Sequence, residues 1–196
     1  MTLMYLYYNQ QEAIKKMESL GYPNSGIDVV IIDDGSKTPL KCDWATVYRI
    51  DKDIPWNMPQ ANNLGFSKIK GTVLRMDMDH SFTLEDLNRL SQIEVKEKQL
   101  IKFRRLYKGK IIYPGPNIYL ARVDDIVNAG GYDERFCGNY GYEDGELMQR
   151  LNKKGFVTLM SEIICHVDDS LSTKGLERDT AINYNKYLKA LEKSNL

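Results

Sequence analysis

Short apolar runs alternate along the chain with segments of helical periodicity. Four of these runs span residues 2–8, 27–32, 46–50 and 73–76. They are rich in aliphatic, aromatic and β-branched residues, which is typical of strands buried on both faces of a parallel sheet. Between the first two runs, Ile14, Met17 and Leu20 fall on one face of a helix. Strands and helices in alternation predict an α/β fold with a mostly parallel central sheet flanked by helices.

Polar residues mark the expected helix starts. Asn9 with Glu12 forms a capping-box pattern, Asn57 opens a helix that runs to about residue 70, and Thr83 opens another. Glu143 begins a later helix after a loop rich in glycine and aromatic residues. The rest of the chain predicts a hairpin over 98–113, a strand over 117–120, a short helix over 123–129, strands over 156–160 and 163–167, and a charged C-terminal helix over 173–196.

Composition narrows the classes of protein. With 196 residues, the chain is expected to form one domain over 1–196. Lys and Arg total 27, equal to Asp and Glu, so no overall charge draws the protein to nucleic acid or an anionic membrane. The three cysteines lack metal-site spacing and predict free thiols in a reducing, cytoplasmic compartment. No basic leader precedes the first run, and no run reaches the roughly 18 apolar residues of a membrane span.

Two carboxylates one residue apart stand at the end of the fourth apolar run. Asp77 and Asp79 would share a face of an extended strand, so they would present a pair of oxygen ligands. Two adjacent negative charges need a cation or hydrogen bonds to offset them. The pair therefore indicates a site for a hard divalent cation, and the alternative is a solvated strand end.

Other polar residues occur where ligands bind in α/β sheets. Asp33 and Asp34 follow the second strand, at the edge where open sheets hold ligands, although this sequence is also ordinary turn chemistry. Glu143 and Asp144 lie in a first helical turn, where the dipole favours ionised carboxylates that can accept a proton. Basic residues gather in the hairpin over 98–113 and indicate either contact with an anion or a solvated face.

The order of several blocks is more specific than any one of them. They are Tyr8-Asn9 after a strand, the run from Val29 to Ser36, Asn62-Asn63-Leu64-Gly65, Asp77-Met78-Asp79, the run from Gly131 to Phe136, and the run from Tyr140 to Glu146. Together they resemble glycosyltransferase family 2 in its GT-A fold, over about residues 3–167. The last two blocks also look like the β-1,4-galactosyltransferase, chondroitin polymerase and polypeptide N-acetylgalactosaminyltransferase groups.

The resemblance implies an inverting transferase that moves a sugar from a nucleotide diphosphate to an acceptor hydroxyl on a glycan or glycoprotein. It favours a UDP-sugar over a GDP-sugar as donor. It implies that Mn²⁺ or Mg²⁺ is held by Asp77, Asp79 and His166. It assigns Asp144 as the general base and Glu143 as a group that orients a hydroxyl. Around the donor nucleotide it places Tyr8, Asn9, Asp33, Asp34, Asn63 and Asp77.

One position departs from the family pattern. Asn62 stands where relatives usually carry Arg, so contact with the donor phosphate is expected from Arg75 or the basic hairpin. Two other functions stay open. A sugar-phosphate nucleotidyltransferase would carry a Gly-rich basic loop after the first strand, where this chain has the run from Tyr8 to Gln11. A non-catalytic carbohydrate-binding relative could keep the fold without turnover.

Overall fold

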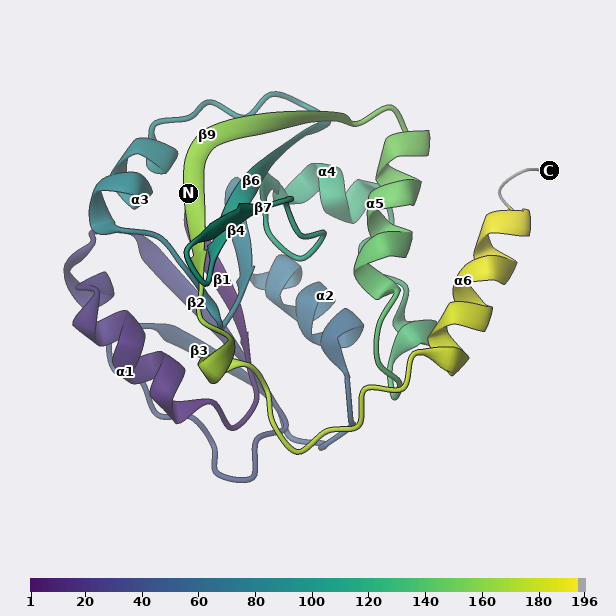
Figure 1. Ribbon diagram of the computed structural model, residues 1–196, viewed down its shortest axis with the longest axis horizontal. Coiled ribbons are helices and arrows are strands. Elements are labelled where there is room, and N and C mark those ends of the chain that lie inside the picture. The colour runs from purple at the N-terminus through teal and green to yellow at the C-terminus, as the bar shows by residue number, and fades with distance from the viewer. Residues whose placement is uncertain (194–196) are drawn as a thin grey trace.

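The computed structural model describes residues 1–193, so the last three residues of the C-terminal helix predicted over 173–196 lie outside the described residues. A central mixed sheet crosses the molecule and carries helices on both faces (Figure 1). The strands are β1 (Thr2–Tyr7), β2 (Asp28–Asp34), β3 (Thr46–Ile50), β4 (Thr72–Asp77), β5 (His80–Ser81), β6 (Gln99–Tyr107), β7 (Lys110–Ile112), β8 (Tyr119–Arg122) and β9 (Val157–Val167). The helices are α1 (Gln11–Ser19), α2 (Met58–Lys68), α3 (Leu84–Ser91), α4 (Val123–Asn128), α5 (Glu143–Lys153) and α6 (Ala181–Lys193). None of the helices within 1–193 combines the length and apolar character that a membrane crossing needs.

The strand order is β3-β2-β1-β4-β8-β6-β9-β5, with β7 paired to β6 alone. The first four strands are parallel, β8 runs antiparallel to β4 and β6, and β9 runs parallel to β6. Leu6 pairs with Ile32 on one side and with Asp77 on the other. This register brings the carboxyl ends of β1, β2 and β4 to one edge of the sheet, which is where the predicted site residues begin.

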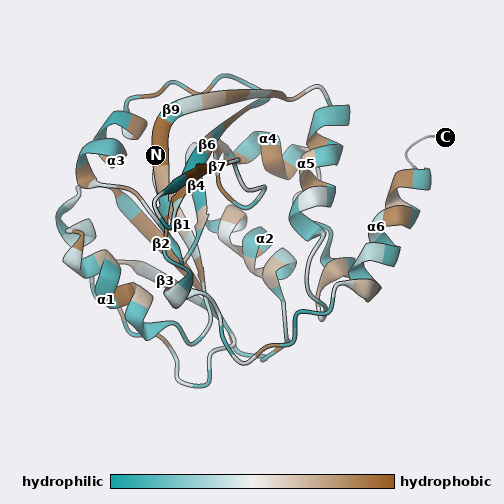
Figure 2. Ribbon diagram, viewed as in Figure 1, coloured by the Kyte–Doolittle hydropathy of each residue, from teal (hydrophilic) through white to brown (hydrophobic). Residues whose placement is uncertain are grey.

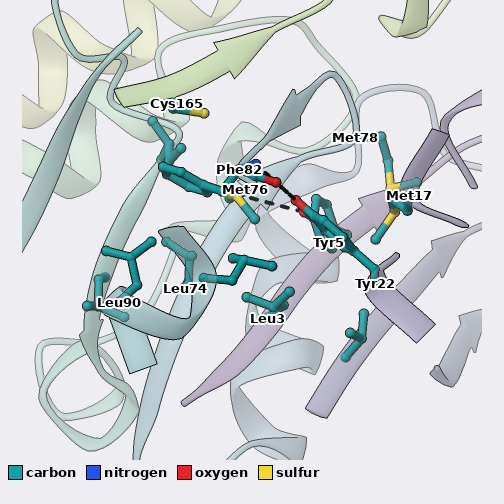
Figure 3. Close-up of a cluster of buried hydrophobic side chains, with 14 of the residues drawn as sticks. Leu3, Tyr5, Met17, Tyr22, Leu74, Met76, Met78, Phe82, Leu90 and Cys165 are labelled. Atoms are coloured by element: carbon teal, nitrogen blue, oxygen red, sulfur yellow. Dashed lines mark hydrogen bonds between the residues drawn. The ribbon is translucent and has the colours of Figure 1, made fainter. Parts of the chain in front are cut away.

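Alternation along the strands divides the core into two clusters. Leu3 and Tyr5 of β1 pack with α1 and α3 on one face, as Figure 3 shows in part. Met4 and Leu6 pack with α2, α4 and α5 on the other face. Figure 2 shows apolar and polar residues mixed along each helix, as expected of helices that have one buried and one exposed side. A sheet covered on both faces explains why the first strands are almost continuously apolar.

Three sequence expectations about elements were wrong. The two strands predicted over 156–160 and 163–167 are one strand, β9, which begins at Val157, because a register shift against β6 between Phe103 and Arg105 absorbs the irregularity without ending the strand. The C-terminal helix begins at Ala181, and residues 172–180 are irregular. Asn9 does not cap α1, because its backbone is left-handed (φ 56°) and its Oδ1 accepts a hydrogen bond from the Lys37 amide. The cap at Thr83 and the hairpin of β6 and β7 are confirmed.

Candidate active site

The carboxyl ends of β1, β2 and β4 open into a cavity of about 820 Å³. Tyr8, Asp34 and Asp77 contribute to its wall from these three strand ends. Arg105 of β6, the first residues of α5 and the segment from 167 to 180 complete it. In Figure 1 this last segment runs from the end of β9 past α2 to α6. The cavity thus gathers residues from the beginning, middle and end of the chain.

The acidic pair lies in this cavity with a histidine that follows it. One ligand atom each from Asp77, Asp79 and His80 lies within 4.8 Å of the others. Asp79 Oδ1 lies 2.6 Å from His80 Nδ1, and Ser172 Oγ donates to Asp79 Oδ2 at 2.6 Å. Burial would raise the pKa of Asp79, but the hydrogen bonds from His80 and Ser172 hold that pKa below its usual value. Asp79 is therefore kept as an ionised carboxylate.

This group suits a hard divalent cation. Carboxylate oxygens are the ligands that Mg²⁺ and Mn²⁺ prefer. His80 is only 4% exposed, and its Nε2 has no hydrogen-bond partner among the described residues. A buried imidazole nitrogen without a partner is costly unless a ligand satisfies it. Asp77, Asp79 and His80 therefore fit the metal that the sequence predicts.

His166 does not reach this group. Its side chain is exposed and is not part of the cavity wall, whereas Val167 beside it does line the cavity. Neighbouring residues of a strand point to opposite faces, and the buried Cys165 before it faces inward. The structure thus places His80, not His166, next to Asp77 and Asp79.

A buried arginine, Arg75, partly neutralises the negative charge of the acidic pair. Arg75 precedes Asp77 by two residues, so both side chains leave the same face of β4. Arg75 is fully buried, and its Nη1 lies 2.7 Å from Asp77 Oδ1. Its Nε donates to Asn62 Oδ1 at 2.9 Å, and Nη1 also donates to the carbonyl of Asn117. Burial alone would lower the pKa of Arg75. The negative charges of Asp77 and Asp144 raise that pKa by more, so the net shift is upward and the guanidinium stays charged.

The Asn62 departure has a structural explanation in this contact. Relatives are expected to carry Arg at this position of α2, and here the Asn62 side chain instead accepts from a guanidinium that reaches across from β4. Arg75 is not part of the cavity wall, although its Nη2 has no partner among the described residues. Arg105 of the basic hairpin does line the cavity. Of the two phosphate contacts expected from the sequence, the hairpin is the one that reaches the cavity.

The second acidic group comes from the start of α5. Glu143 and Asp144 both line the cavity, as the sequence predicts for the first turn of this helix. Tyr132 donates its hydroxyl hydrogen to Asp144 Oδ1 at 2.6 Å, which orients this carboxylate. Glu143 is 7% exposed, and its Oε2 has no partner among the described residues. Burial, followed by the charge of Asp144, raises the pKa of Glu143 to about 8. At neutral pH Glu143 is therefore mainly a neutral hydrogen-bond donor.

Tyr8 and Asp34 lie together on another part of the wall. Tyr8 donates its hydroxyl hydrogen to Asp53 Oδ1 at 3.1 Å. Asp34 accepts from Asn57 Nδ2 at 2.9 Å, so Asn57 uses its side chain here and not to cap α2. Burial raises the pKa of Asp34 to about 6, although the hydrogen bond from Asn57 lowers it in part. A carboxylate beside an aromatic ring can accept hydrogen bonds from a base or a ribose hydroxyl.

Three residues predicted near the nucleotide lie outside the cavity wall. Asp33 is fully buried and accepts from the Ser36 and Leu40 amides, and Arg49 Nη1 lies 2.5 Å from its Oδ2. Asn9 holds the turn after β2 through its contact with the Lys37 amide. Asn63 donates to the Tyr132 carbonyl and accepts from the Tyr132 amide, at 2.9 and 2.8 Å. All three are held in contacts that shape the loops around the cavity.

Sequence reasoning missed an aromatic and cationic group in the wall. Trp56 and Tyr140 lie with their ring centroids 4.5 Å apart. The Arg178 guanidinium lies 5.5 Å from the Trp56 ring and 5.8 Å from the Tyr140 ring. Arg178 belongs to the irregular segment before α6, which offers no periodicity to read. The Trp-Asn dipeptide after the third strand and the aromatic loop before Glu143 were the available signals.

The comparisons with known proteins agree with this geometry at the level of the fold. No family model and no curated protein matches the sequence. Among solved structures, S. aureus TarS residues 1–349 aligns over 95% of this chain with TM-score 0.62 and 13% identity. GalNAc-T7 with UDP, GalNAc and Mn²⁺ aligns over 85% with TM-score 0.60 and 12% identity. The chain has the GT-A fold.

A third solved neighbour is a complex that contains xylobiose. Drosophila β1,4-galactosyltransferase 7, as the D211N mutant with manganese, UDP-Gal and xylobiose, aligns over 82% of this chain with TM-score 0.54 and 14% identity. The chain covers 62% of TarS, 43% of GalNAc-T7 and 65% of this galactosyltransferase. The predicted GT-A fold, with its mostly parallel central sheet, is thus confirmed.

Proposed function

We propose that the chain is a metal-dependent, inverting glycosyltransferase that takes a sugar from a nucleotide diphosphate, preferably a UDP-sugar. One observation carries this proposal: the acidic pair of Asp77 and Asp79 and the acidic helix start at Glu143 and Asp144 share one cavity. A transferase needs both groups, because one handles the leaving diphosphate and the other handles the attacking hydroxyl. The GT-A neighbours support this proposal because three of their structures are complexes with UDP, UDP-GlcNAc and UDP-Gal.

Asp77 and Asp79 would hold Mn²⁺ or Mg²⁺, which when bound supplies positive charge to the leaving diphosphate. His80 supports Asp79 through Nδ1, and its Nε2 has no partner among the described residues. His166 as a third ligand stays a prediction from the resemblance. Arg105 lines the cavity and forms no ion pair among the described residues, so its guanidinium is available to bind the donor phosphates.

Asp144 acts as the general base. Tyr132 occupies Asp144 Oδ1, so Oδ2 is left to take the proton from the acceptor hydroxyl. As that proton moves to Asp144, the hydroxyl oxygen forms a bond to the anomeric carbon. The bond from that carbon to the diphosphate oxygen breaks on the opposite face, which inverts the anomeric configuration and releases the nucleoside diphosphate. Glu143, protonated at neutral pH, donates a hydrogen bond to a sugar hydroxyl.

The rest of the proposed site binds the nucleotide and the acceptor. Tyr8, Asp34 and Asp77 face the base and ribose from the strand ends. Asp33, Asn9 and Asn63 support them by holding the adjoining loops. The acceptor is a glycan or a glycoprotein, which matches the neutral overall charge of the chain.

Hydrolysis of UDP-sugars and GDP-sugars tests the proposal. We expect release of UDP that depends on Mn²⁺ or Mg²⁺, is lost in Asp79→Ala and is lost in Asp144→Asn without loss of UDP binding. Asp124→Asn is the matched control, because Asp124 is exposed on α4 and lies outside the cavity wall. If no nucleotide sugar is turned over or bound in a metal-dependent way, the proposal is wrong. Release of pyrophosphate from a nucleoside triphosphate and a sugar phosphate would instead indicate a nucleotidyltransferase.

A further inference from the structure

Three tyrosine rings pack together next to the cavity; Tyr142 lines it, and Tyr184 and Tyr187 extend outside the cavity wall from Tyr142. Tyr142 lines the cavity and directly precedes Glu143 and Asp144. Its ring centroid lies 5.2 Å from that of Tyr184 and 5.3 Å from that of Tyr187, both on α6. Tyr142 is 37% exposed and Tyr184 is 44% exposed, so the surface is open to solvent. We call these three rings the tyrosine platform.

Tyr142 is the N-cap residue of α5, and its backbone is left-handed. Tyr142 has φ +70°, a left-handed conformation that a glycine would adopt freely and a bulky residue rarely adopts. Packing against two rings of α6 helps to hold the residue in this conformation. Strain retained in a cavity wall is a feature of functional sites. The ring makes contacts with Tyr184 and Tyr187 that a glycine could not make.

Hydrogen bonds from α6, which carries Tyr184 and Tyr187, hold the platform in position. Asn183 of α6 is fully buried, and its Nδ2 donates to the Phe136 and Asn139 carbonyls at 3.0 and 2.7 Å. Lys186 Nζ donates to the Arg135 carbonyl at 2.6 Å. These contacts attach α6 to the loop that leads into Tyr142. The platform is thus rigid where a ligand would lie, and a prepared surface loses little entropy on binding.

We propose that the tyrosine platform binds the acceptor and that the acceptor is a saccharide of at least two sugar units. The inference rests on the proposed function and names the acceptor of that same site. A sugar ring has an apolar face of C–H groups that packs on an aromatic ring, and hydroxyl groups at its edge that carboxylates can accept from. One unit would lie over Tyr142 with a hydroxyl at Asp144, and the next would continue over Tyr184 and Tyr187. The negative charge of Asp144 at one end disfavours an anionic acceptor.

Saccharide titrations of the whole chain with UDP and Mn²⁺ present would test this inference. The probes are xylobiose, lactose and N,N′-diacetylchitobiose, and binding is followed by NMR chemical shifts. We expect at least one probe to bind at millimolar concentration, and its affinity to fall about 3- to 10-fold in Tyr184→Ala and in Tyr187→Ala. Ile182→Ala is the matched control, because Ile182 is an exposed apolar residue of the same helix and lies outside the cavity wall.

A further variant separates the ring from the backbone. Tyr142→Gly relieves the left-handed strain, so we expect saccharide binding to fall while the melting temperature is held or raised. A ring with a purely structural role would lower the melting temperature and leave saccharide binding unchanged, which would overturn the inference. Binding of none of the three probes, or transfer to a peptide alone, would also overturn it. Metal-dependent UDP-sugar hydrolysis, measured in parallel, shows separately whether the proposed function itself holds.

Discussion

Replacing Arg75 with Met removes the only positive charge in contact with Asp77 among the described side chains. The variant loses the 2.7 Å ion pair to Asp77, and it leaves the Asn62 Oδ1 atom and the Asn117 carbonyl without this donor. Removing one partner of a buried ion pair costs about 3–5 kcal/mol, and the cost here lies toward the lower end because the Asp77 side chain is 29% exposed. This loss is a large part of the roughly 5–15 kcal/mol by which a domain is stable. We therefore expect a variant that is folded but much closer to its unfolding threshold.

Urea unfolding followed by circular dichroism, with EDTA present, measures this cost. The double variant Arg75→Met with Asp77→Asn should be more stable than Arg75→Met alone by about 0.5–3 kcal/mol, because the uncompensated charge is gone. Arg89→Met is the control, since Arg89 makes only a solvent-exposed pair with Asp86 at 3.6 Å and should change stability little. A loss below about 1 kcal/mol for Arg75→Met, a value typical of exposed pairs, would refute this reasoning.

Three further predictions concern the histidines, the helix start and the last helix. Calorimetric titration with Mn²⁺ should show an affinity about 10- to 100-fold lower in His80→Ala, and a smaller change in His166→Ala; the reverse result would restore His166 as a ligand. Because Glu143 titrates near 8 in the folded chain and near 4.5 when unfolded, the folded state holds the extra proton, so stability should fall as pH rises between these values. The melting temperature measured between pH 4.5 and 8 should depend less on pH in Glu143→Gln than in the unmodified chain. An unchanged dependence would contradict the role given to Glu143. Asn183→Ala leaves two loop carbonyls without their donor and should cost about 1–3 kcal/mol, with faster proteolysis before α6; unchanged proteolysis would speak against that role.

Much of the fold was predictable because its signals are local and periodic. Apolar runs of strand length, separated by helices, fix a doubly covered sheet, and the carboxyl ends of such strands fix one edge for ligands. Asp77, Asp79 and the helix start at Glu143 could be placed for this reason. The continuity of β9 was less predictable, because the bulge within it depends on the pairing with β6.

The remaining site residues depend on the direction of each side chain, which a motif does not specify. Asp33 and Asp34 are adjacent on one strand, so only one of them can face the cavity, and the sequence does not say which. Asn63 lies one position from Asn62 on α2, and that step of about 100° turns it toward the loop at Tyr132. Arg178 comes from an irregular segment whose path is set by contacts with Trp56 and Tyr140.

The hydrogen bond from Ser172 to Asp79 joins the segment before α6 to a carboxylate of the acidic pair. The same segment is tied to that residue by its backbone, since the Asp168 amide donates to the Asp79 carbonyl at 2.9 Å. A cation bound at Asp79 would compete with Ser172 for the same carboxylate and so change how firmly residues 168–172 are held. By reciprocity, a change in the anchoring of this wall segment would change the affinity for the cation.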